Sequence, residues 1–389
     1  MSVEFHLGHQ DQHKVEDFLA TGPDGVRGIV LHGKSAPYQL AAAEAARELG
    51  LDVFYAPGTA QMAYQDPDGV LDKLPAYDGI RHDTDKLAAN APLRLAVVER
   101  VLAAHPEQTT VITPPTYFIE NERTARLVVD LAEQTRLSSP KPVRPVLYLS
   151  TRLSRGLMVG LARELVSAGI AEVDLRLSPT SGESDGLRKV RQVLATAQLF
   201  KDVGLVTTLG HSGNLGQVAL SLGHVDHYSV GIGQNEHVNF RTMIGRQVNP
   251  PKKPLAQNGK PKSSGSWEGI YLPGLALTVS RKTGQALLEH SDIRTRIGCR
   301  IDGCANAITG PLGDSRTHYL HARAAEVATM LSRPAPWRPQ LEADRLARAL
   351  ELRKLINDRY RTPNVPQLRT RTIESLLQDI AEERQADVA

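Results

Sequence analysis

Residues 204–239 read GLVTTLGHSGNLGQVALSLGHVDHYSVGIGQNEHVN, and this stretch decides which fold the rest of the chain must fit. Residues 204–209 form a short run rich in β-branched residues, which is typical of a buried strand. Apolar residues then recur at helical spacing over residues 215–222, and Gly223 can end that helix. Residues 227–233 predict the next strand. A strand, a helix and a second strand in this order predict two parallel strands joined by a helical crossover.

A glycine-rich turn, residues 210–214, leads from the first of these strands into the helix. Free backbone N–H groups and the positive end of the helix dipole favour an anion at such a turn. In a β/α barrel, the late loops often bind phosphate. The alternative is that the glycines only make tight turns. The candidate substrate-binding residues in this stretch are His211, Ser212, Asn214, Gln234 and Asn235.

Strand-like and helix-like segments alternate through the preceding sequence. The predicted strands are residues 26–31, 52–55, 109–113, 143–149 and 172–177, and the predicted helices are 38–49, 93–104, 122–135, 157–167 and 187–199. Residues 269–279 are the predicted eighth strand. This alternation is typical of a (β/α)8 barrel or a doubly wound sheet, and the number of strands favours the TIM-like barrel.

Two segments interrupt the alternation, and the C-terminal region is predicted to be helical. We expect a barrel over residues 1–297, with insertions at about 64–90 and 241–267, and a C-terminal helical extension over 298–389. Predicted helices in the extension span residues 318–331, 341–360 and 371–383.

The overall composition is that of a globular protein with a nearly balanced charge. The chain has 389 residues, with 46 Lys and Arg against 43 Asp and Glu, so a nucleic-acid partner is permitted but not required. Its two cysteines predict no disulfide scaffold. No signal peptide and no apolar run of membrane-spanning length is recognisable, so we expect a cytoplasmic protein without a membrane partner.

A barrel places its working groups at the C-terminal ends of its strands. Side chains expected together on that face are His32, Gln61, Tyr117, Ser150, Arg176, His211 and Ser229. Of these, Gln61, Tyr117 and Arg176 join Gly58 as candidate substrate-binding residues. Carboxylates are scarce at the strand ends, and Glu236 is the best placed of them to act as a nucleophile or base. The alternative for Glu236 is a helix-capping or solvated acid.

Four motifs occur in the order found in a known family. They are the strand–helix–strand region of residues 172–236, the turn YAPGTAQ at 55–61, CRIDGC at 299–304 and SRTHYLH at 315–321. Together they resemble tRNA-guanine transglycosylases, the family of queuine, archaeosine and other 7-deazaguanine transglycosylases. The resemblance implies a barrel enzyme of the pentosyl-transferring type that exchanges or recognises a purine or deazapurine base in tRNA or DNA.

The chain departs from the family at the residues that carry the chemistry. Ala56 stands where the family has its first aspartate, and Ser229 stands where it has the nucleophilic aspartate. A serine without a base lacks the charge that stabilises an oxocarbenium centre. The candidate catalytic residues are therefore Glu236 or Asp226 as a substitute acid, with Ser229 at the nucleophile's position.

Three functions remain open from the sequence. One is a remodelled transglycosylase, and another is a non-catalytic relative that binds nucleic acid, as one half of a homo- or heterodimer. The third is a β/α-barrel enzyme that acts on a phosphorylated small molecule. For nucleic acid, Lys252, Lys253, Lys260 and Lys262 form a candidate basic loop, whose alternative is a solvated insertion.

Zinc is the cofactor that the resemblance implies. Cys299 and Cys304 keep only the outer spacing of the family's cysteine motif, because Ile301 replaces the middle cysteine. His318 and His321 could complete a set of four ligands. The family's late histidine ligand also has no counterpart near residues 336–337. Since these two ligands are missing, we expect no cofactor, and we expect burial of Leu320, Val327 and Leu331 to hold the C-terminal segment on the barrel.

Overall fold

A computed structural model describes residues 1–250, 268–299 and 310–386. Its main sheet has seven parallel strands in the order β3-β2-β1-β7-β6-β5-β4. The strands are β1 (Ser2–His6), β2 (Val26–His32), β3 (Asp52–Ala56), β4 (Val146–Ser150), β5 (Glu172–Ser178), β6 (Val206–Leu209) and β7 (His227–Gly231). The crossovers between them are helical, so the predicted α/β class is confirmed.

An extended segment, residues 109–119, joins the two edges of this sheet. The Thr110 N–H donates to the Val53 carbonyl of β3 over 2.9 Å, and the Ile119 N–H donates to the Tyr148 carbonyl of β4 over 2.8 Å. The sheet therefore curls into a barrel in which this segment takes the eighth position. Pro114 and Pro115 lie within the segment and have no N–H to donate, which explains why it forms bridges rather than a full strand.

The sequence identified the wrong segment as the eighth strand. Residues 269–279 form an antiparallel hairpin of β8 (Gly269–Leu272) and β9 (Leu277–Ser280) outside the barrel sheet. The strand that was overlooked is β1, which lies between β2 and β7. Glu4 interrupts the apolar run of β1. Because alternate side chains of a strand point to opposite faces, Glu4 points into the barrel while its neighbours Val3 and Phe5 face the helices.

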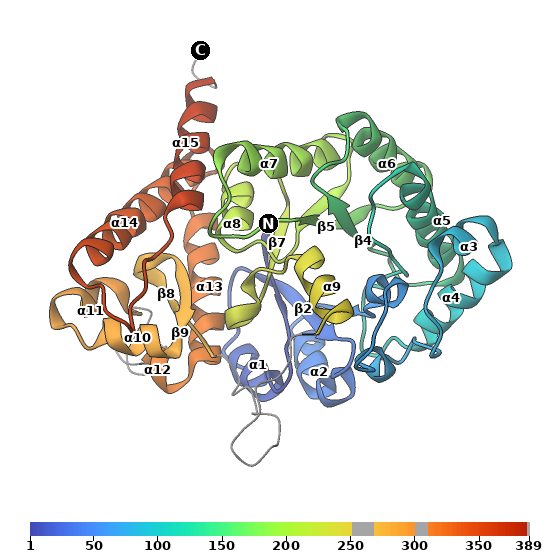
Figure 1. Ribbon diagram of the computed structural model, residues 1–389, viewed down its shortest axis with the longest axis horizontal. Helices are drawn as coiled ribbons and strands as arrows, with labels where there is room; N and C mark the ends of the chain where they lie inside the picture. Colours follow the sequence, from blue (N-terminus) through green and yellow to red (C-terminus); the bar gives the residue numbers. More distant parts are fainter. Residues whose placement is uncertain (251–267, 300–309, 387–389) are drawn as a thin grey trace.

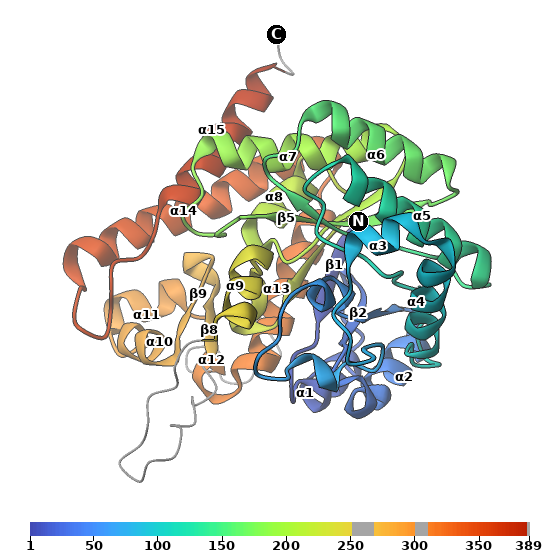
Figure 2. The same cartoon turned by 45° about the vertical axis from the view of Figure 1, so that its right-hand side comes forward.

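Helices surround the barrel, as Figures 1 and 2 show. Those around it are α1 (Gln12–Leu19), α2 (Leu40–Glu48), α4 (Ala91–Ala103), α5 (Glu122–Ser138), α6 (Arg155–Ser167), α7 (Leu187–Asp202), α8 (Gly213–Ser221) and α13 (Ser315–Leu331). The insertion after β3 contains α3 (Thr84–Ala89), and α9 (Phe240–Val248) follows β7. The Phe240 ring of α9 stacks on Phe118 and contacts the tilted ring of Tyr148, so α9 lies across the C-terminal end of the barrel.

The C-terminal helices pack both on the barrel and on the hairpin. They are α10 (Arg281–Leu288), α11 (Ser291–Ile297), α12 (Gly310–Gly313), α14 (Arg338–Arg359) and α15 (Arg371–Ala386). Helix α13 contacts α1 and β1, with Leu320 and Val327 fully buried and Leu331 partly buried. The hairpin, α10 and α11 share a second apolar cluster with α14. Packing thus crosses the boundary predicted at residue 298 in both directions.

The described helices include none with the length and apolar character that a bilayer crossing requires.

Candidate active site

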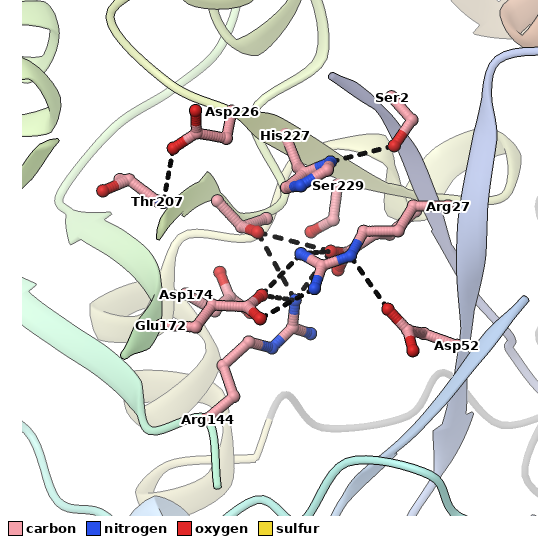
Figure 3. Close-up of polar contacts among 12 residues, drawn as sticks. Ser2, Arg27, Asp52, Arg144, Glu172, Asp174, Thr207, Asp226, His227 and Ser229 are labelled. Atoms are coloured by element: carbon pink, nitrogen blue, oxygen red, sulfur yellow. Dashed lines mark hydrogen bonds and ion pairs between the residues drawn. The ribbon is translucent and has the colours of Figure 1, made fainter. Parts of the chain in front are cut away.

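The inside of the barrel is polar, because the inward positions of several strands carry charged residues. On β1, Phe5 packs on Phe18 of α1, whereas Glu4 points the other way and accepts a hydrogen bond from Arg144 over 2.6 Å. Arg27 donates to Glu172 over 2.7 Å and to Asp52 over 3.0 Å. Figure 3 shows this network at the N-terminal ends of the strands. In a β/α barrel that end serves stability rather than chemistry.

A second polar pair lies closer to the C-terminal ends of the strands. On β5, Arg176 makes two hydrogen bonds to Oδ2 of Asp174, at 2.8 and 3.1 Å, and a third to the Tyr148 hydroxyl at 3.1 Å. Asp174 is fully buried, and in the described part of the chain its Oδ1 atom has no hydrogen-bond partner. The bidentate pairing fixes the Arg176 guanidinium in one orientation, with its outer N–H groups still able to donate.

Two histidines and a serine form the next layer. The His6 and His211 rings are 4.0 Å apart between centroids, and His6 Nε2 lies 2.9 Å from the Ser229 hydroxyl. The Ser229 oxygen also accepts the His211 backbone N–H over 3.2 Å. His211 Nδ1 lies 3.0 Å from the Asn235 carbonyl, which can only accept. Neutral His211 therefore carries its proton on Nδ1 and has a lone pair on Nε2.

Both histidines are uncharged at neutral pH. Burial, followed by the charge of Arg176, lowers the pKa of His211 to about 3. Burial and the neighbouring His211 hold the pKa of His6 well below its usual range. These imidazoles are consequently neutral hydrogen-bonding groups rather than fixed cations.

A cavity of about 310 Å³ opens at the C-terminal ends of the strands, above these groups. The ionisable side chains that line it are His6, His9, His32, Lys34, Tyr148, Arg176 and His211. Among the described residues that line the cavity there is no aspartate or glutamate. The lining is therefore suited to an anion.

Lys34 and His32 occupy the side of the cavity formed by the end of β2. Lys34 is half-buried, and burial lowers its pKa below that of an ordinary lysine. His32 also has a lowered pKa, mainly through burial and next through the charge of Lys34. His9 lies close to both the cavity and Ser35, whose hydroxyl is 3.4 Å from His9 Nδ1.

The cavity brings together part of the predicted substrate-binding set. The members that line it are Gly58, Gln61, Arg176, His211 and Asn235. Tyr117 does not line the cavity and is buried, with its hydroxyl 2.7 Å from His82 Nδ1. Gln234 is exposed beyond the cavity, and Ser212 is buried, with its hydroxyl donating to the Leu209 carbonyl over 2.7 Å.

The glycine turn before α8 does not form an open anion site, which corrects that interpretation. Asn214 is buried, where it donates to the Ala276 carbonyl and accepts from Arg345, so the hairpin and α14 cover this helix end. A Cβ atom at Gly213 would lie 3.1 Å from Glu236 Oε1. The His237 ring and the Glu236 carboxylate thus lie against Gly213 at the start of α8.

The three candidate catalytic residues lie in different places. Glu236 is buried outside the cavity lining, in an ion pair with Arg323, and it accepts a hydrogen bond from Thr278 over 2.8 Å. Asp226 lies at the opposite end of the barrel, where it accepts from the Thr207 N–H and pairs with Lys201. Ser229 lies directly beneath His6 and His211 and has no exposed surface.

Sequence reasoning missed His6 and His9, both of which line the cavity. His6 is the last residue of β1, the strand that was overlooked, and His9 comes three residues after it. The alternating side chains of SVEFH are the sequence signal that could have identified β1. Tyr148 was inside a predicted strand, but its inward direction was not assigned.

The predicted nucleic-acid lysines and one cysteine cannot be placed. Lys252, Lys253, Lys260 and Lys262 lie outside the described residues, as does Cys304. Cys299 is buried. The His321 ring packs edge-on against Phe18, and burial lowers its pKa. His318 Nε2 lies 2.7 Å from the Tyr271 carbonyl. The described residues contain no group of three or more side chains arranged to hold a metal ion.

No known protein family and no curated protein matches the chain. Among solved structures, a protein titled "QR15, an Aldolase" shares 10% identity over 64% of this chain and 97% of its own, with a TM-score of 0.34. A candidate fructose-1,6-biphosphate aldolase from Coccidioides immitis shares 10% identity over 85% and 88%, with a TM-score of 0.35. A candidate deoxyribose-phosphate aldolase from Toxoplasma gondii ME49 shares 12% identity over 64% and 94%, with a TM-score of 0.33. These scores are too low to carry an argument, so the barrel assignment rests on the strand order and closure described above.

Proposed function

We propose that this protein is a β/α-barrel enzyme that acts on a small molecule bearing a phosphate or carboxylate group, bound in the strand-end cavity. The observation that carries this proposal is the composition of the cavity lining, which has cationic and imidazole side chains and no described carboxylate. Arg176 would hold the anion, since Asp174 fixes its orientation and leaves donors facing the cavity.

His211 is the proposed proton carrier. Its Nε2 atom has the free lone pair, and the charge of Arg176 is one cause of its low pKa. A bound anion would offset that charge and raise the pKa of His211, so that substrate binding would prepare the ring to accept a proton.

A calorimetric binding screen tests this proposal. Phosphate esters and small carboxylates should bind with saturation, whereas their uncharged alcohols and amides should not. Arg176→Gln should weaken binding at least tenfold, because it removes the oriented donor pair. Since that change leaves Asp174 buried and unpaired, Asp174→Asn combined with Arg176→Gln provides a second variant for which folding is easier to preserve. Arg152→Gln is the matched control, because Arg152 is exposed at a neighbouring strand end and does not line the cavity.

A transglycosylase-like exchange of a purine or deazapurine base is a second proposal. The observation in its favour is that Ala56, Gly58 and Gln61, from the turn that resembles the family, line the cavity. Against it, Ser229 is enclosed and the described lining supplies no carboxylate nucleophile. Binding of 7-deazaguanine bases, tRNA or duplex DNA, with no binding of small anions, would favour this second function over the first.

A further inference from the structure

We propose that the Lys34 amine forms an imine with a carbonyl group of the substrate, so that the substrate is a small aldehyde or ketone that also carries a phosphate or carboxylate. This inference rests on the proposed function and adds a covalent step to it.

The placement of Lys34 is the first argument. It follows the C-terminal end of β2 and lines the same cavity as Arg176. Within residues 1–250, 268–299 and 310–386, its amine makes no ion pair or hydrogen bond, unlike that of Lys14, which pairs with Asp314. A lysine that serves only as a structural cation is normally paired when half-buried, whereas a nucleophilic amine must be unpaired.

The surroundings of Lys34 favour the uncharged amine. Burial is the largest influence and lowers its pKa, Lys73 lowers it further, and Asp66 acts in the opposite direction. Asp66 is engaged by its own loop, since it accepts a hydrogen bond from the Leu71 N–H. The other titratable groups about the amine are His32 and His9, which share the cavity with it.

The same groups can complete the reaction. The amine lone pair attacks the carbonyl carbon, and an imidazole of His32 or His9 carries one nitrogen proton to the carbonyl oxygen, which becomes a hydroxyl. The imidazole then takes the second nitrogen proton and gives it to this hydroxyl, which leaves as water while the C=N bond forms. The sum is amine plus carbonyl giving imine plus water, and it requires no oxidant or reductant. Arg176 would meanwhile hold the anionic group.

Reductive trapping tests this step. The full-length protein is incubated with glycolaldehyde phosphate or pyruvate and sodium cyanoborohydride, and modified lysines are identified by mass spectrometry of peptides. We expect Lys34 to be modified at least tenfold faster than Lys73, which is exposed on the neighbouring loop. The rate at Lys34 should also reach its plateau at a lower pH than the rate at Lys73. Lys34→Arg, which keeps the charge, should remove this labelling, and Lys73→Arg should preserve it.

The outcomes separate this inference from the proposed function. Labelling of Lys34 no faster than that of exposed lysines would overturn the imine step. If pyruvate or inorganic phosphate still bound in an Arg176-dependent manner, the proposed function would survive that result. If neither anion bound in the cavity, both proposals would fail.

Discussion

At the scale of single residues, burial keeps His6 and His211 neutral, and this has a consequence for stability. His211 has a pKa of about 3 in the folded protein, against about 6.5 for an unperturbed histidine in an unfolded chain. As the pH falls from 6.5 towards 3, the unfolded state binds a proton that the folded state does not. Each such group then reduces the free energy of unfolding by up to about 1.4 kcal/mol per pH unit.

Replacement of His211 should therefore reduce the loss of stability in acid. We expect His211→Asn to give a shallower dependence of the free energy of unfolding on pH between 6.5 and 4, measured by urea denaturation. Leu137→Asn, at an exposed position on α5, exchanges side chains that do not titrate and should leave the slope unchanged. An unaltered slope in the His211 variant would show that this ring is not held neutral by the fold.

The sequence predicts those site residues that directly follow a recognisable strand, because a barrel places its working groups at the C-terminal ends of its strands. Arg176, Gln61 and His211 follow directly from strands whose apolar runs are recognisable. His6 was missed because Glu4 interrupts the apolar pattern of its strand. Glu4 is stable there because Arg144 and Arg27, from distant segments, pair with it. Such a partnership depends on tertiary structure and leaves no local signal.

At the scale of elements, the glycine turn and α8 show how packing can reverse a local interpretation. The turn has the sequence of an anion site, but the hairpin and α14 cover its helix end. The Glu236 carboxylate lies beside it and pairs with Arg323 of α13. The ion pair links the loop after β7 to the C-terminal helices. Glu236 is therefore expected to stabilise the fold rather than to react.

Removal of this carboxylate tests that role. Glu236→Gln should lower the free energy of unfolding by about 3 kcal/mol, the lower end of the cost of breaking a buried ion pair, because Glu326 still pairs with Arg323. Anion binding in the cavity should persist. Glu133→Gln, exposed on α5, is the control for the loss of one charge. An unchanged stability together with lost turnover would instead support the catalytic role that the resemblance suggested.

At the scale of the whole molecule, the sequence predicted the α/β class, whereas barrel closure and the packing of the C-terminal helices depend on tertiary contacts. The alternation of strands and helices predicted the barrel, but the closing segment, residues 109–119, is interrupted by prolines and pairs with both edges only through a few backbone bonds. The hairpin, which precedes residue 298, packs on α14, and α13, which follows residue 298, packs on α1 and β1. Contacts therefore cross the predicted domain boundary from both sides. Those contacts depend on which apolar faces meet in space, and periodicity along the chain does not specify that.

We expect an anion to bind in the strand-end cavity rather than at the glycine turn or on the outer surface. Diffraction from crystals soaked in tungstate distinguishes these places, because the heavy atom locates the oxyanion by its anomalous scattering. A peak is expected inside the cavity, within hydrogen-bonding reach of Arg176, and it should disappear in the Asp174→Asn, Arg176→Gln variant. Peaks confined to the surface or to the N-terminus of α8, with the cavity empty, would contradict this expectation.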